Sequence, residues 1–138
     1  MAYWLIKSEP DVWSFEDQMN KGGPEEWHGV RNYAARNHMR AMKIGEKAFF
    51  YHSNQGKEIV GIAKVAALSH PDSTTDDPRW DCVDFIGDKP FKRPVTLEKI
   101  KVHPELQEMV LVNNSRLSVQ PVTDREWKII CELGGVSA

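Results

Sequence analysis

The apolar residues of this chain fall into short segments that turn-forming residues interrupt. The segment from Tyr3 to Lys7 is aromatic and branched, as in a β-strand, and Ser8-Glu9-Pro10 stops it. From Trp80 to Phe85 polar and apolar residues alternate, which is typical of a strand with one wet face. Further strand candidates cover residues 47–52, 58–68 and 118–120, with a hairpin turn at 53–57 and a loop at 69–79. None of these runs approaches the roughly 20 residues of a membrane span, so we expect no membrane association.

Helix start signals lie between these strand candidates. Ser14 and Asp17 form a capping-box pattern, and Gly22-Gly23-Pro24 ends the short helix that follows. Asn32 is a candidate N-cap for a helix from about Tyr33 to Lys43, with Gly45 just past its end.

Two more helices are expected in the C-terminal part. Thr96 begins a short helix that reaches Val102. Thr123-Asp124-Arg125-Glu126 is a second capping box, in which Val122 can pack on Trp127, and Gly134-Gly135 ends that helix. Several strands with short helices between them predict an α+β fold around a curved sheet or small barrel.

Length and composition are those of one small globular domain. The chain has 138 residues, of which 41% are hydrophobic and 28% charged, and we expect a single domain over residues 1–138. The first apolar segment is too short for a secretory signal. Cys82 and Cys131 are too few for a disulfide framework, so we expect a reducing, cytoplasmic compartment.

The charge pattern argues against a protein that coats long stretches of duplex. The formal net charge is -2, whereas such coating requires many cations to neutralise phosphates. Residues 28–45 nevertheless contain no acid and carry four cations, Arg31, Arg36, Arg40 and Lys43. A local basic spot on an acidic body fits a small anionic target, and the alternative is a solvated helix face.

Signatures of catalysis and of metal binding are missing from the sequence. It has no G-x-S-x-G, Walker loop, H-E-x-x-H or C-x-x-C motif, and its five histidines lack the spacing of metal ligands. Cys82 stands in an apolar alternation that indicates a buried, inert thiol. A pairing of Cys82 with His52 in space is the remaining catalytic alternative.

Residues 27–37 are the most informative stretch for binding. They combine two aromatic rings, a glycine, two arginines and two amides, which are the groups that stack on bases, read base edges and meet phosphate. The alternative is structural, with Trp27 and Tyr33 in the core and Asn32 serving only as a helix cap. Two further stretches are weaker candidates: residues 49–54, where a strand becomes polar, and residues 115–118, which point Arg116 and Ser118 to one side.

Taken in order, these stretches resemble an EVE domain. The motifs are Tyr3-Trp4-Leu5-Ile6-Lys7-Ser8-Glu9-Pro10, then Trp27-x-Gly29-Val30-Arg31-Asn32-Tyr33-x-Ala35-Arg36-Asn37, Tyr51-His52-Ser53-Asn54, Gly61-Ile62-Ala63 and Arg116-Leu117-Ser118-Val119-x-Pro121-Val122. The resemblance covers Tyr3 to Leu133. The chain departs from the family at His28, where an acid is common, and at Ala34, where glutamine is common.

The resemblance implies a fold and a function. The fold is that of the PUA-like superfamily, a curved, mixed β-barrel surrounded by short helices. The function is non-catalytic binding of nucleic acid, DNA or RNA, through a pocket for a modified base, with modified cytosine the usual suggestion. We expect no metal and no cofactor, and a monomer or a weak oligomer. The alternatives are a small enzyme acting on a modified nucleoside and a protein-interaction module.

The resemblance also implies roles for individual residues. Trp27 corresponds to a wall of the pocket, with Lys7 and Ser8 beside it and Tyr51, His52 and Ser53 closing the other side. We expect Trp27 and Tyr33 to stack on the base, and Asn32, Ser8 and Ser53 to hydrogen-bond its edge. Arg31, Arg36 and Arg116 would neutralise flanking phosphate or support the wall. Lys7, Trp27, Tyr51 and Arg116 are therefore expected around one concavity.

Overall fold

The computed structural model describes residues 1–138, and its strands and helices alternate along the chain. The elements, in order, are β1 (Tyr3–Ser8), α1 (Phe15–Lys21), β2 (Glu25–Glu26), α2 (Tyr33–Ala41), β3 (Lys47–His52), β4 (Glu58–Pro71), β5 (Asp81–Thr96), α3 (Leu97–Val102), α4 (Val110–Asn113), β6 (Val119–Val122) and α5 (Asp124–Gly134). No helix combines the length and the apolar character that crossing a membrane requires.

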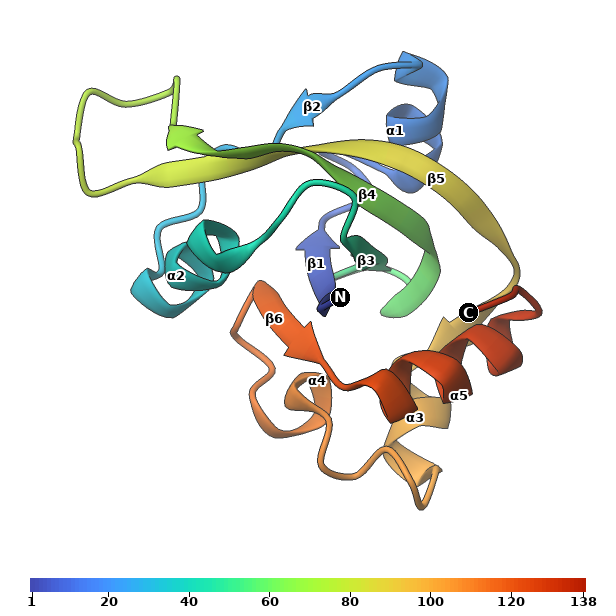
Figure 1. The fold of residues 1–138 in the computed structure, drawn as a ribbon. Helices are drawn as coiled ribbons and strands as arrows, with labels where there is room; N and C mark the ends of the chain where they lie inside the picture. The colour runs from blue at the N-terminus through green and yellow to red at the C-terminus, as the bar shows by residue number, and fades with distance from the viewer.

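The six strands form one mixed sheet in the order β2-β5-β4-β3-β1-β6. Strand β1 pairs in parallel with β3 and antiparallel with β6, and the remaining pairs are antiparallel. The long strands β4 and β5 bend along their length (Figure 1), and their register shifts at several bulges. The prediction of a closed barrel was wrong. Strands β2 and β6 are free edges, so the curved sheet stays open.

Each face of the sheet carries its own hydrophobic core. One core contains Ile6 and Phe50 from the sheet with Phe15 of α1 and Met39 of α2. The other core contains side chains of β1 and β3 together with α3, α4 and α5, as in Leu5, Phe49, Ile100, Leu111 and Trp127. In Figure 1, α3, α4 and α5 gather at one end of the molecule, away from α1. Successive residues of a strand point to opposite faces, which is why Phe49 and Phe50 enter different cores.

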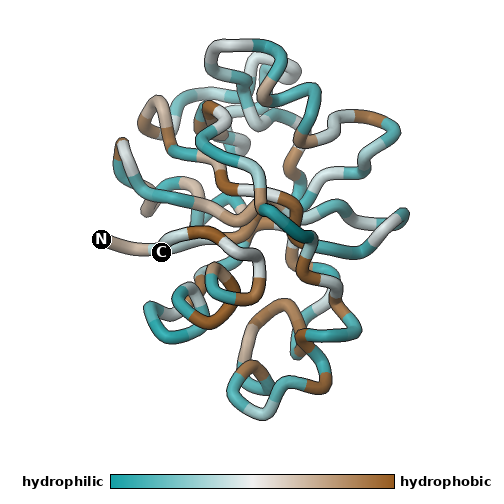
Figure 2. The backbone as a smooth tube through the Cα atoms, turned by 90° about the vertical axis from the view of Figure 1, so that its right-hand side faces the viewer, coloured by the Kyte–Doolittle hydropathy of each residue, from teal (hydrophilic) through white to brown (hydrophobic).

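The predicted helix caps are present. The side chain of Ser14 accepts from the N–H of Asp17, and that of Thr123 accepts from the N–H of Glu126, each with the reciprocal bond of a capping box. Helix α5 ends at Gly134, and the residue that caps it, Gly135, has a φ of 75° that glycine adopts without strain. Hydrophobic stretches gather toward the middle of the molecule, and many of the outer turns are hydrophilic (Figure 2).

Several element ends differ from prediction. Helix α2 stops at Ala41 because Met42 has extended backbone angles and turns its side chain into the core. Strand β4 continues to Pro71 and β5 to Thr96, beyond the predicted limits. The full length of β5 was not predicted because it contains Pro90 and Pro94, and proline in a sequence normally argues against a strand. The short β2 and α4 were not predicted.

Candidate functional site

A concavity of about 400 Å³ opens where three non-contiguous parts of the chain meet. Its walls are the end of β1 with the loop before α1, the segment from β2 to the start of α2, and Ser118 before β6. The lining residues are Lys7, Ser8, Glu9, Val12, Trp13, Glu25, Glu26, Trp27, His28, Gly29, Val30, Arg31 and Ser118. We refer to this concavity as the pocket. Its volume lies in the range of small-molecule sites, roughly 300–1,000 Å³.

Two tryptophans give the pocket its apolar surface. Trp27 is only 8% exposed, and its ring meets the rings of Phe50 and Phe85 edge-on, with centroids 5.6 and 5.5 Å away. The backbone N–H of Trp27 donates to the carbonyl of Val83 at 2.9 Å, which ties this wall to β5. Trp13 is held by a hydrogen bond from its Nε1 to Gln18 Oε1 at 2.9 Å. Both walls are therefore fixed by the sheet or by α1.

Polar groups at the end of β1 complete that side of the pocket. Ser8 Oγ donates to the carbonyl of Trp13 at 2.5 Å and so fixes the loop that carries this tryptophan. Lys7 Nζ donates to the carbonyl of Ser115 at 2.6 Å, and the Lys7 N–H donates to the carbonyl of Ser118 at 3.0 Å. Partial burial lowers the pKa of Lys7 below its ordinary value.

The opposite wall is anchored by Asp72, whose side chain is almost fully buried. Its Oδ2 accepts from the N–H of Gly29 at 2.8 Å and from Arg31 Nη1 at 3.0 Å. Its Oδ1 accepts from the N–H and the hydroxyl of Thr74, at 2.8 and 2.5 Å. Burial alone would raise the pKa of Asp72, but these donors outweigh it and hold the pKa well below its usual range. Asp72 is therefore an ionised carboxylate that joins the loop before β5 to the pocket wall.

The structure brings some of the predicted site residues to the pocket. These are Lys7, Ser8, Trp27, Arg31 and Ser118, which come from three separate parts of the sequence.

Tyr51 does not share the concavity of Trp27, contrary to expectation. It belongs to the core on the other face of the sheet, where burial raises the pKa of its hydroxyl. Lys7 pairs with it in register and places its ammonium 5.8 Å from the Tyr51 ring centroid, while also bordering the pocket. Arg116 is exposed and does not line the pocket.

Other predicted residues have structural partners outside the pocket. Asn32 caps α2 by accepting from the N–H of Ala35 at 2.9 Å. His52 Nε2 accepts from the N–H of Phe15 at 3.1 Å, which satisfies a donor at the start of α1, and burial lowers its pKa. The N–H of Ser53 donates to the carbonyl of Ser8 at 3.0 Å. Tyr33 and Arg36 lie on the outer side of α2, next to Trp80.

Sequence reasoning missed Trp13, Glu9, Glu26 and Asp72. One signal was available for Trp13, because it precedes the Ser14 cap, a position from which side chains often pack back onto the helix. Asp72 stands in a loop rich in acids, and the sequence does not mark which of them folds inward.

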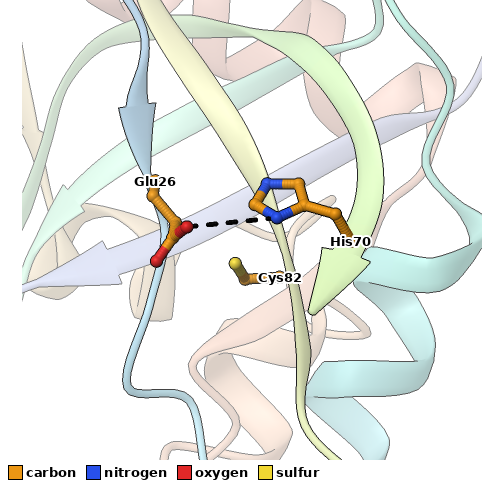
Figure 3. Close-up of side chains that lie close together, drawn as sticks. All are labelled: Glu26, His70 and Cys82. Atoms are coloured by element: carbon orange, nitrogen blue, oxygen red, sulfur yellow. Dashed lines mark ion pairs between the residues drawn. The ribbon is translucent and has the colours of Figure 1, made fainter. Parts of the chain in front are cut away.

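Glu26, which lines the pocket, lies close to His70 and Cys82, and the three have the residue types of a metal or catalytic site (Figure 3). His70 Nε2 lies 2.8 Å from Asp84 Oδ1, and its Nδ1 lies 3.0 Å from the carbonyl of Pro71 and 3.9 Å from Glu26 Oε2. Since all three partners are acceptors, both ring nitrogens serve as donors, and a protonated imidazolium has no lone pair for a metal or for general-base work. Burial raises the pKa of the Cys82 thiol to about 12, the opposite of activation. The cluster instead joins β2 to β4 and β5.

A second hollow, of about 670 Å³, lies around Trp4, Lys43 and the N-terminus. Its carboxylate, Glu46, already accepts from the N–H of Ala2, the N–H of Lys43 and Trp4 Nε1, at 2.8 to 3.1 Å. We therefore take the pocket beside Trp27 as the candidate site.

Comparison with known proteins gives the same relatives by sequence and by structure. The EVE domain model matches residues 2–133. Mouse thymocyte nuclear protein 1 is 38% identical over 166 residues, covering 95% of this chain and 73% of the mouse protein. A crystal structure of a protein from Agrobacterium tumefaciens is 56% identical with a TM-score of 0.98, covering 99% of this chain and 95% of the other. Human THYN1 protein, solved in complex with DNA that contains 5-methylcytosine, is 34% identical with a TM-score of 0.91 over 100% of both chains. This chain belongs to the EVE domain family.

Proposed function

We propose that this protein is a non-catalytic nucleic-acid-binding protein that holds one modified base, a modified cytosine in DNA, in the pocket between Trp13 and Trp27. The observation that carries the proposal is the pocket itself, in which two tryptophans stand beside hydroxyl, guanidinium and carboxylate groups. Aromatic walls with a few fixed polar groups are the usual arrangement for binding a flat heterocycle. The relative human THYN1 protein, solved with 5-methylcytosine-containing DNA, supports this choice of ligand.

The polar groups of the pocket suit cytosine better than thymine. The cytosine edge carries an N4 amino donor, for which carboxylates are the natural acceptors, whereas thymine has a carbonyl there. Glu9, Glu25 and Glu26 all line the pocket. Glu25 pairs with Lys21, and Glu26 accepts from Ser73, but the carboxylate of Glu9 has no partner within the chain. We assign Glu9 as the acceptor for the amino group, and the side chains of Val12 and Val30 as contacts for a methyl group.

The energy balance favours an unpaired target. Stacking contributes about 1–3 kcal/mol per base, and extruding a base from a duplex costs a few kcal/mol. A single pocket therefore binds an unpaired or already extruded base best.

We assign no catalytic step to the site. Cys82 is fully buried with a raised pKa, and His70 beside it has both ring nitrogens occupied as donors. The rival function, an enzyme acting on a modified nucleoside, requires an activated nucleophile or base at the pocket. Product released from 5-methyl-2′-deoxycytidine, and lost in a Glu9→Gln variant, would favour the enzyme.

Titration with short single-stranded DNA oligonucleotides tests the proposal, with tryptophan fluorescence as the readout. The oligonucleotides are identical except for 5-methylcytosine, cytosine or thymine at the central position. We expect the methylated strand to bind most tightly and to change the fluorescence of Trp13 and Trp27. Equal affinity for all three strands would refute recognition of a modified cytosine.

Glu9→Gln is the sharpest variant, because Glu9 is exposed and its loss does not disturb the core. We expect it to weaken binding of both cytosine strands more than binding of the thymine strand. Tyr51→Phe is the matched control on the other face of the sheet. A Glu9→Gln variant that binds all strands like the wild type would remove Glu9 from the assignment.

A further inference from the structure

An aromatic pair lies on the surface beside the pocket. Tyr33, in the first turn of α2, stacks on Trp80, at the end of the loop before β5, with ring centroids 5.0 Å apart and an angle of 23° between planes. Tyr33 is 50% exposed. The pair joins α2 to the loop before β5. Its rings also offer flat faces against which neighbouring side chains can pack.

Guanidinium groups surround this pair. The Arg36 guanidinium lies 4.8 Å from the Tyr33 ring centroid, and that of Arg79 lies 6.0 Å from the Trp80 centroid. Arg79 Nη1 also donates to the Tyr33 hydroxyl at 3.3 Å. Cation–π contacts position these groups without using their N–H donors. We call Tyr33, Arg36, Arg79 and Trp80 the arginine–aromatic surface.

The charge balance singles out Arg36. Arg79 pairs with Asp77 at 2.6 Å, and Arg40, one turn further along α2, pairs with Asp81 at 2.6 Å. Arg36 donates only to neutral acceptors: Nε and Nη2 donate to Asn37 Oδ1 at 3.1 and 2.8 Å, and Nη1 donates to the carbonyl of Arg79 at 2.9 Å. Its positive charge therefore has no carboxylate partner, and its remaining N–H groups are available to an anion.

The surface is continuous with the pocket through Arg31. This residue lines the pocket, and its guanidinium lies 5.5 Å from the Trp80 centroid. Arg31 is also fixed by Asp72, so the rim of the pocket and the arginine–aromatic surface form one connected structure.

We infer that the arginine–aromatic surface, through Arg36, binds a backbone phosphate of the single DNA strand whose base occupies the pocket. The inference rests on the proposed function and adds a second contact outside the pocket. Arginine forms strong charge-assisted hydrogen bonds with phosphate, here through the remaining N–H groups of Nη1 and Nη2, and the stacked rings hold the guanidinium in place before the strand arrives. The carboxylates of Asp77 and Asp81 neutralise the neighbouring arginines, which limits the surface to about one phosphate and agrees with the low net charge of the chain.

The salt dependence of binding tests this inference on the same methylated and unmethylated oligonucleotides. A phosphate contact is independent of the base, and each one contributes about 0.7 to the slope of log affinity against log salt for a single strand. We expect Arg36→Gln to weaken binding of both strands by the same factor and to flatten the slope by about 0.7. Arg36→Lys keeps the charge and should restore the slope, which a purely structural role of Arg36 would not predict.

Arg40→Gln is the matched control, since it removes an arginine from the same helix whose charge is already paired. We expect its slope to equal that of the wild type. Equal slopes for Arg36→Gln and the wild type would overturn the phosphate contact, while a preference for the methylated strand would still support the pocket. Conversely, an Arg36-dependent slope without any preference for the methylated strand would support the phosphate contact and refute the proposed base recognition.

Discussion

The backbone N–H of Gly29 donates a hydrogen bond to the buried Oδ2 of Asp72 at 2.8 Å, across a gap of 43 residues in the sequence. Gly29 has a φ of 82°, a conformation that side chains other than glycine rarely adopt. This backbone conformation points the Gly29 N–H at the carboxylate. The same Oδ2 of Asp72 also accepts a hydrogen bond from the guanidinium of Arg31. One buried acid thus positions the wall of the pocket.

Replacing that acid tests its role. We expect Asp72→Asn to lower the free energy of unfolding by about 1–3 kcal/mol, because the amide keeps the shape but loses the charge that Arg31 and the N–H donors satisfy. The folded pKa is depressed, so this stabilisation is complete above about pH 4 and is lost as the pH falls toward the folded pKa. In urea unfolding at several acidic pH values, the free energy of unfolding should fall less with decreasing pH for Asp72→Asn than for the wild type. If the free energy of unfolding fell equally with pH in both proteins, the charge of Asp72 would not contribute to stability.

For His70 we expect the contribution to the free energy of unfolding to change with pH in the opposite direction. Its hydrogen bond with Asp84 raises the pKa above the ordinary value, despite some desolvation. The stabilisation from the imidazolium is therefore complete below about pH 6.5 and is lost as the pH rises through the folded pKa. We expect the stability difference between wild type and His70→Gln to shrink across that range. Because burial lowers the pKa of His38 and His52, this difference is more informative than the wild-type curve alone.

Gly61 should not tolerate a methyl group. A Cβ at this buried position would lie 2.3 Å from Cζ of Phe15, whose ring packs edge-on against Phe50. We expect Gly61→Ala to cost about 1–3 kcal/mol in thermal or urea unfolding, as overpacked cores do. Gly23→Ala is the control, since a Cβ there meets nothing within 4 Å, and its effect should stay within about 0.5 kcal/mol. Equal effects at both positions would show that Phe15 moves aside freely.

Tyr51→Phe separates the two faces of the sheet. The Tyr51 side chain lies in the core opposite Trp27, so we expect the affinity for a methylated strand to remain within about twofold of the wild type, a change below about 0.5 kcal/mol. Fluorescence titration provides the measurement. A tenfold loss of affinity in Tyr51→Phe would show that Tyr51 does take part in binding.

Local signals predicted the helices better than the sheet. The Ser14 and Thr123 caps act within four residues, so the sequence contains nearly all the information that determines them. The order of the strands depends on pairings such as β1 with β6, which join residues more than a hundred positions apart. Barrel closure was expected from the family resemblance, and nothing in the chain marks β2 and β6 as free edges.

One grouping in the predicted site was wrong, that of Tyr51 with Trp27. Tyr51, His52 and Ser53 were treated as one wall, but consecutive strand residues alternate between faces, and Tyr51 therefore points away from Trp27. The resemblance led us to expect Asn32 and His52 at the ligand, yet both satisfy N–H donors at helix starts, and for Asn32 this is the helix cap that the sequence also predicted. Trp80 was predicted only as part of a strand and not as part of the site, because only the folded loop brings it to Tyr33.

The position of β1 between β3 and β6 also has a consequence during synthesis. Strand β1 is made long before the strand that covers one of its edges, which spans Val119–Val122. Pairing across so many residues carries a large loop-closure cost and slows folding. One edge of this aromatic strand therefore stays without its native partner until residues 119–122 have left the ribosome, although β3 can pair with the other edge earlier.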